Sequence, residues 1–149
     1  MTKFVPRDAA VTASRIRVHG IEELGASVPG LVARLAAATG LTHSQAYRMR
    51  LAAEEITTNT VVHGYLGGDG WIDIDGGFDR DWVWMRFEDV APEFDPTAYD
   101  PAPRLAMDPR AAPLGGLGVF LAVTSVDSFE HSYTGGRNRN LLKMRRAAV

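Results

Sequence analysis

The chain has 149 residues, of which 46% are apolar and 23% charged, and these ordinary globular values favour one domain over residues 1–149. Its net charge of −2 supplies no basic field, so the composition argues against direct binding to nucleic acid. Cysteine is absent, which excludes disulfides and thiolate metal sites, and no apolar run resembles a signal peptide or a membrane span. We therefore expect a cytoplasmic protein without a membrane segment.

The first third of the chain predicts a strand and a helix. Residues 14–19 alternate loosely between apolar and polar, as a half-buried strand does. Apolar residues then recur at helical spacing up to Gly40, which supplies a left-handed helix end: Val28, Leu31, Val32 and Leu35. Thr42–Gln45 matches a capping box, so a second helix is predicted from Thr42 to about His63.

This second helix carries the first candidate functional residues. Its apolar arc consists of Ala46, Met49, Ala52, Ala53, Ile56 and Thr60. Glu54 falls on the opposite side beside Arg50, one turn earlier, as a solvated ion pair would. Glu55 and Asn59 project from one face at the border of the apolar arc. A carboxylate there can accept a proton, and a carboxamide oxygen can hold a hard cation.

The second half of the chain predicts two hairpins separated by a loop and a helix. Strands 71–75 and 82–89 are joined by the Gly76–Gly77 region, and strands 129–134 and 140–145 by Gly135–Gly136. The proline-rich stretch 90–113 has almost no periodicity, which is typical of a functional lid or a disordered segment. Residues 117–126 follow the glycines as a helix. The order predicts an α+β sandwich with a mixed, mostly antiparallel sheet and helices on one face.

Four motifs occur in order along the chain. They are Glu55…Asn59…His63-Gly-Tyr65; Asp89 with Pro92-Glu-Phe-Asp-Pro96; Gly115-Gly-Leu-Gly-Val-Phe-Leu121; and Gly135-Gly-Arg-Asn138. In order and spacing, from about residue 14 to 145, they resemble the anti-sigma-factor serine/threonine kinase family. Members of that family are stand-alone, histidine-kinase-like ATPase domains of the Bergerat (GHKL) fold, a two-layer sandwich.

The resemblance implies a role for each motif. Glu55 would be the catalytic base, Asn59 the ligand of Mg²⁺, and Asp89 the acceptor for the adenine amino group of ATP. The loop Gly115-Gly116-Leu117-Gly118 would hold the phosphates at the start of a helix, and residues 95–114 would form the ATP lid. Arg104 and Arg110 lie in that lid. Two interpretations are open for them: contact with the phosphates, or, as we expect, solvated side chains.

One position departs from the family pattern. The family usually has glycine two residues after the aspartate, whereas this chain has Ala91. Glycine there permits backbone geometry and space that a methyl group blocks, so we expect weakened or altered contact with the nucleotide at this position.

The implied function is an anti-sigma factor that phosphorylates a serine of an anti-anti-sigma antagonist and sequesters a sigma factor, commonly as a homodimer. An alternative is a catalytically weak or inactive regulator that responds to nucleotide and binds a partner. The detached catalytic domain of a sensor histidine kinase would need an upstream phosphoacceptor hairpin, for which residues 1–41 leave little room. A ligand-free α+β domain would make the four motifs a coincidence.

Overall fold

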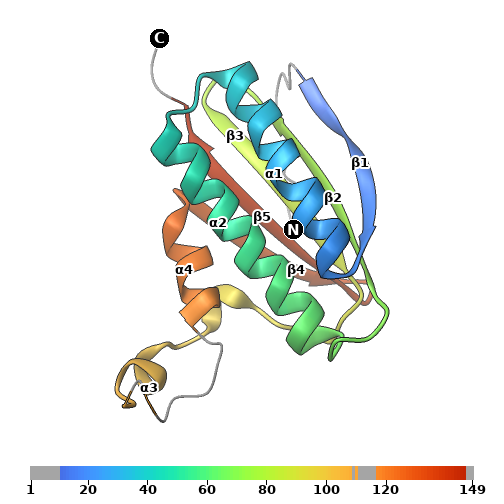
Figure 1. Cartoon of the computed structure of the whole chain (residues 1–149), viewed down its shortest axis with the longest axis vertical. Coiled ribbons are helices and arrows are strands. Elements are labelled where there is room, and N and C mark those ends of the chain that lie inside the picture. Colours follow the sequence, from blue (N-terminus) through green and yellow to red (C-terminus); the bar gives the residue numbers. More distant parts are fainter. Residues whose placement is uncertain (1–10, 109, 111–116, 147–149) are drawn as a thin grey trace.

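The computed structural model of the chain describes residues 11–108, 110 and 117–146. A single sheet lies behind three helices, and a short fourth helix stands away from it (Figure 1). The main elements are β1 (Val11–His19), α1 (Gly20–Thr39), α2 (His43–Asn59), β2 (Trp71–Phe78), β3 (Trp82–Asp89), α4 (Leu117–Ser125), β4 (Ser128–Thr134) and β5 (Arg137–Arg145). The minor ones are a π-helical turn η1 (Thr60–Gly64), a 3₁₀ turn η2 (Pro96–Ala98) and α3 (Ala102–Leu105).

The fold is an α+β sandwich, consistent with the Bergerat fold. The strand order is β1-β2-β3-β5-β4, and neighbouring strands pair antiparallel throughout. The prediction that some strands of the sheet pair in parallel is therefore wrong for the described strands. Because β5 inserts between β3 and β4, the end of β3 lies directly beside the start of β5.

The core lies between the sheet and the helices α1, α2 and α4. Alternate residues of the central strands point into it, as the period of a strand requires. They include Ile72, Ile74, Val83, Met85, Phe87, Leu142 and Met144. The helices contribute the residues that the helical spacing predicts, among them Val28, Leu31, Val32, Leu35, Met49, Ala52 and Ile56. Both predicted helical faces are therefore confirmed.

The first hairpin turns later than predicted. Gly76 and Gly77 lie inside β2, and the turn is made by residues 79–81, where the Asp79 carboxylate accepts hydrogen bonds from two backbone N–H groups. A Cβ on Gly76 would lie 3.1 Å from Leu35 Cδ1 and from the Trp84 carbonyl oxygen. A side chain at position 76 would be crowded because α1 and β3 lie close to the strand there, which sequence spacing does not reveal.

Of the other element boundaries, some agree with the predictions and some differ. The capping box is confirmed, since Thr42 and Gln45 exchange side-chain-to-backbone hydrogen bonds. The helix it starts is α-helical only to Asn59 and continues as η1. The loop predicted over 90–113 contains η2 and α3, and β5 begins three residues before the predicted position 140. Gly135 and Gly136 adopt positive φ in the predicted turn.

The face of the sheet opposite the helices carries an ion-pair network. Asp73 and Glu88 are buried there, each bound by arginines from neighbouring strands, notably Arg15, Arg17 and Arg139. The hydrogen bond from Arg17, which outweighs burial, lowers the pKa of Asp73. Burial by itself would raise the pKa of Glu88, but the hydrogen bond and charge of Arg139 lower it overall. These contacts join β1, β2, β3 and β5 on one face.

Within the described residues, no helix is long and apolar enough to cross a membrane.

Candidate functional site

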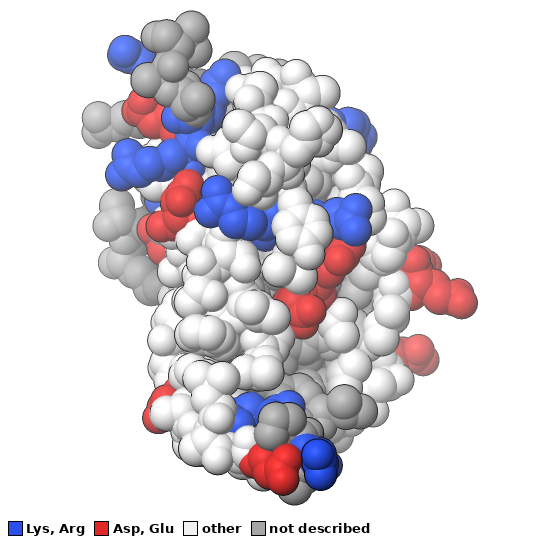
Figure 2. Space-filling view, turned by 60° about the vertical axis from the view of Figure 1, so that its left-hand side comes forward, with Lys and Arg blue, Asp and Glu red and all other residues white. Residues whose placement is uncertain are grey.

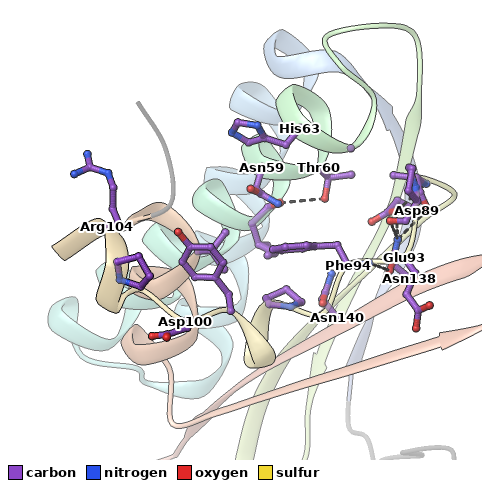
Figure 3. Close-up of a pocket in the computed structure, with 18 of the residues that line it drawn as sticks. Asn59, Thr60, His63, Asp89, Glu93, Phe94, Asp100, Arg104, Asn138 and Asn140 are labelled. Carbon is purple, nitrogen blue, oxygen red and sulfur yellow. Dashed lines mark hydrogen bonds between the residues drawn. The ribbon is translucent and has the colours of Figure 1, made fainter. Parts of the chain in front are cut away.

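A cavity of about 790 Å³ opens between the end of α2, the end of β3 and the segment after β3. This volume lies in the usual range for small-molecule sites. Asn59 and His63 reach it from the helix, Asp89 and Asn138 from the paired strands, and Asp100 and Arg104 from the opposite side (Figure 3). Residues 95–107 therefore contribute to the wall of the cavity, which fits the predicted lid.

Asp89 is the buried carboxylate of this cavity. It ends β3, is only 2% exposed, and its Oδ1 accepts hydrogen bonds from Asn138 Nδ2 at 2.9 Å and from the Ala91 N–H at 3.0 Å. Burial raises the pKa of Asp89, and the hydrogen bonds from Asn138 and Ala91 oppose that rise. Such a group is suited to accept a hydrogen bond from a ligand N–H in the cavity.

Glu55 lines a second, adjoining cavity of about 460 Å³ between α2 and α4. The two cavities share Asn59, His63, Arg104 and Val119, so they meet at the end of α2. Glu55 and Asn59 face the same space, as their spacing predicts, and Glu54 instead forms an ion pair with Arg50 at 3.2 Å. A ligand that fills the first cavity and extends past Asn59 would approach the Glu55 carboxylate.

The start of α4 lies against Glu55. A Cβ on Gly118 would be 2.2 Å from Glu55 Oε2, so only glycine admits the carboxylate at this distance. Leu117 and Gly118 both line the second cavity. Gly115 and Gly116, predicted to hold phosphates, lie outside the described residues. The helix N-terminus itself favours negative charge, whether from Glu55 or from a phosphate.

The structure supplies space for the Ala91 methyl group. A Cβ on Gly64 would lie 2.8 Å from the Ala91 Cβ, so the methyl group fills the space that Gly64 leaves open. Ala91 is buried and also lines the first cavity. Among the described non-glycine residues, positive φ occurs only at Leu66, so the backbone at Ala91 does not require glycine. Glycine at position 64 therefore accommodates the Ala91 methyl group within the protein, while the expected effect of this methyl group on nucleotide contact stays a prediction.

Sequence reasoning missed the roles of Asn138 and Asn140, and for Arg104 it preferred a solvated side chain to one that reaches the phosphates. The motif containing Asn138 was identified, but its sequence favours a polar hairpin turn, and only the β3–β5 register pairs Asn138 with Asp89. Asn140 also lines the first cavity, and its Oδ1 lies 3.0 Å from His131 Nδ1. Arg104, expected to be solvated, lines both cavities and is partly buried. No local sequence signal separates it from Arg110.

Tyr65 holds the end of the helix to both strand ends that flank the site. Its hydroxyl donates to the Trp71 carbonyl at 2.7 Å and accepts from the Val90 N–H at 3.0 Å. A Cβ on Gly70 would lie 2.3 Å from the Tyr65 ring, so glycine is needed for this approach. The segment that follows Asp89 is thereby fixed to η1.

A magnesium ion would have few protein ligands here. Among the described residues, no group of three or more His, Asp or Glu side chains is placed to hold a metal. Asn59, where the two cavities meet, offers a carboxamide oxygen. This fits Mg²⁺, which usually takes one or two protein ligands and completes its shell with waters and phosphate oxygens.

Comparison with known families gives one match. A family model described as a histidine kinase-like ATPase domain matches residues 22–146, which include both cavities. Comparison with curated proteins gave no significant match.

Proposed function

Because this chain belongs to the histidine kinase-like ATPase domain family, we propose that it binds ATP in the first cavity and transfers the γ-phosphoryl group to a serine or threonine hydroxyl. The observation that carries the proposal is that the two cavities adjoin at Asn59, which lines both. One end holds a buried carboxylate, Asp89, and the other holds a partly exposed one, Glu55.

Asp89 selects the base. Its carboxylate accepts a hydrogen bond from the 6-amino group of adenine, whereas guanine presents a carbonyl oxygen at the same place and repels it. A base that leaves this buried acceptor unpaired, or places another acceptor against it, is strongly disfavoured relative to adenine. The apolar walls of the cavity supply the surface against which the base packs, and Phe94 and Val119 are among them.

Asn59 lies where the phosphates leave the first cavity. Asn59 Oδ1 would hold Mg²⁺ there, and the ion would supply positive charge that neutralises the negative charge developing on the phosphates. The N-terminus of α4 and the guanidinium of Arg104 face the same space and favour the negative charge.

Glu55 takes the proton. As the hydroxyl oxygen forms its bond to the γ-phosphorus, the bond from phosphorus to the β,γ-bridging oxygen breaks, ADP leaves, and the hydroxyl proton passes to Glu55. Val62 and Leu121, each about two-fifths exposed, also line the cavity of Glu55 and give its rim an apolar character. Figure 2, which turns this part of the molecule toward the viewer, shows Lys and Arg next to Asp and Glu instead of a field of one sign.

The regulatory role is proposed from the resemblance of the motifs. The acceptor serine would belong to an anti-anti-sigma antagonist, the sequestered partner would be a sigma factor, and the protein would act as a homodimer. Asp89 and Gly118, together with Glu55 and Asn59, are the matched positions that support this subfamily.

The test combines binding with transfer. Calorimetric titration with ATP, with and without Mg²⁺, should give magnesium-dependent binding, and labelled phosphate should then appear on a serine of the co-purifying antagonist. Glu55→Gln should retain binding and lose transfer, while Asn59→Ala should lose the magnesium dependence. Binding without transfer by the wild-type protein would favour the alternative, a nucleotide-responsive regulator. Absence of binding at millimolar ATP would refute both.

A further inference from the structure

The carboxamide of Asn138 connects β5 to the segment that leads into the lid. Asn138 is 3% exposed and lies directly across from Asp89 in the β3–β5 pair. Its Nδ2 donates to Asp89 Oδ1 at 2.9 Å and to the carbonyl oxygens of Ala91 and Pro92 at 3.1 Å each. Its Oδ1 accepts from the Phe94 N–H at 3.1 Å.

These contacts use the whole carboxamide. The two N–H bonds of the carboxamide face three acceptors, so one N–H is shared between two of them. The carboxamide oxygen accepts from the one remaining backbone donor, the Phe94 N–H. An aspartate would lack the donors and would repel Asp89. An aliphatic residue would take one of the two hydrogen-bond donors from the buried Asp89 carboxylate and remove the side-chain partner of the backbone groups of Ala91, Pro92 and Phe94, which is unfavourable.

The first consequence concerns the Asp89 carboxylate. Hydrogen bonds from Asn138 and from the Ala91 N–H both end on Oδ1, so the plane of the carboxylate is fixed. The carboxylate is thereby oriented before any ligand enters, and such preorganisation reduces the entropy lost on binding.

The second consequence concerns the lid. Phe94 is the last residue whose backbone Asn138 holds, and directly after it Asp95 accepts from the Thr97 N–H and begins η2. Beyond that point, Asp100, Arg104 and Met107 line the far wall of the cavity. The contacts of Asn138 therefore end at Phe94, two residues before η2, whose Pro96 is buried. The residues that line the far wall of the cavity follow η2.

We infer that Asn138 is a positioning residue with two tasks: it orients Asp89 for base selection and anchors the near end of the lid at Phe94. The base-selection task rests on the proposed binding of ATP. The anchoring task does not, because the hydrogen bonds to Phe94, Ala91 and Pro92 are all made within the protein.

The test uses the full chain with Asn138→Ala and Asn138→Thr. Threonine suits a strand, and its hydroxyl can still donate to Asp89, but this one short group cannot reproduce the contacts that the longer carboxamide also makes with Ala91, Pro92 and Phe94. In the absence of nucleotide, exchange of the Phe94 amide hydrogen should accelerate at least about tenfold in both variants. Calorimetry with ADP and GDP should show that Asn138→Ala loses about tenfold or more of the preference for ADP, while Asn138→Thr keeps most of it. Arg139→Gln, the next position on the same strand with its side chain on the opposite face, is the matched control and should change neither readout.

Two results would overturn the inference. Unchanged Phe94 exchange in both variants would remove the anchoring task, and an unchanged ADP preference in Asn138→Ala would remove the base-selection task. If the wild-type protein binds neither nucleotide, the proposed function fails and base selection fails with it, whereas the exchange experiment still decides the anchor. If the alanine variant does not fold, as judged by its amide spectrum, the threonine variant decides. Unchanged Phe94 exchange in Asn138→Thr would then refute the anchoring task, and loss of its preference for ADP would refute the base-selection task.

Discussion

Replacing Gly118 by alanine is expected to slow phosphoryl transfer without weakening the fold. The new methyl carbon would lie 2.2 Å from Glu55 Oε2. A carbon and an oxygen without special attraction approach to about 3.3 Å, so the carboxylate oxygen must retreat by about 1 Å. The Glu55 side chain is partly exposed and flexible at its end, so it can move at little energetic expense.

The magnitude follows from the role of the displaced group. A displacement of about 1 Å of a catalytic group costs about 10²-fold in rate, equivalent to about 2.7 kcal/mol of activation free energy. The fold should be unaffected or slightly stabilised, because alanine is favoured over glycine in a helix by up to about 1 kcal/mol. Stability and rate should therefore change independently.

The assay measures three quantities: the transfer rate at saturating ATP, the affinity for ADP and the urea midpoint. Gly30→Ala in α1 is the matched control, because nothing lies within 4 Å of its added Cβ. In a Glu55→Ala background, Gly118→Ala should cause no further loss of rate, since the displaced group is already absent. An equal loss in both backgrounds would refute the reasoning. Weaker ADP binding with an unchanged saturating rate would instead assign Gly118 to the phosphates.

Three further predictions concern the buried carboxylates and the packing of the site. Burial raises the pKa of Asp89, so its ionised form costs stability once the pH exceeds the folded pKa. The variant Asp89→Asn should therefore be at least as stable as wild type in urea at pH 7, yet it should bind ADP about 100-fold more weakly. A clear loss of stability in this variant would contradict the reasoning. Asp73 and Glu88 have lowered pKa values, so they contribute stability above pH about 4 that is lost as the pH falls further. Urea titrations from pH 7 to 2.5 should therefore show that the free energy of unfolding falls less steeply in the double variant Asp73→Asn/Glu88→Gln than in wild type. Equal slopes of this free energy against pH would argue against the network. Gly64→Ala should destabilise the protein by about 1–3 kcal/mol because the new Cβ would overlap Ala91 Cβ. Adding Ala91→Gly should recover most of that loss. If the changes in the free energy of unfolding of the two single variants simply add in the double variant, the contact is disproved.

The sequence alone determined the features that depend on local spacing. Apolar periodicity identified the buried faces of α1 and α2, the capping box fixed the start of α2, and the positions of Glu55 and Glu54 on the wheel separated a cavity residue from a surface ion pair. These features follow from residues a few positions apart in one element, so the chain carries their geometry locally.

Only the tertiary structure decided the features that join distant segments. The antiparallel register brings Asn138 to Asp89 across 49 positions, close packing by α1 and β3 leaves little room for a Cβ at position 76, and Gly64 provides the space for the Ala91 methyl group. Each depends on how closely two separate elements approach, which is set by side-chain packing and strand pairing over the whole domain. A sequence pattern identifies which residue types are present, whereas packing decides which of them meet.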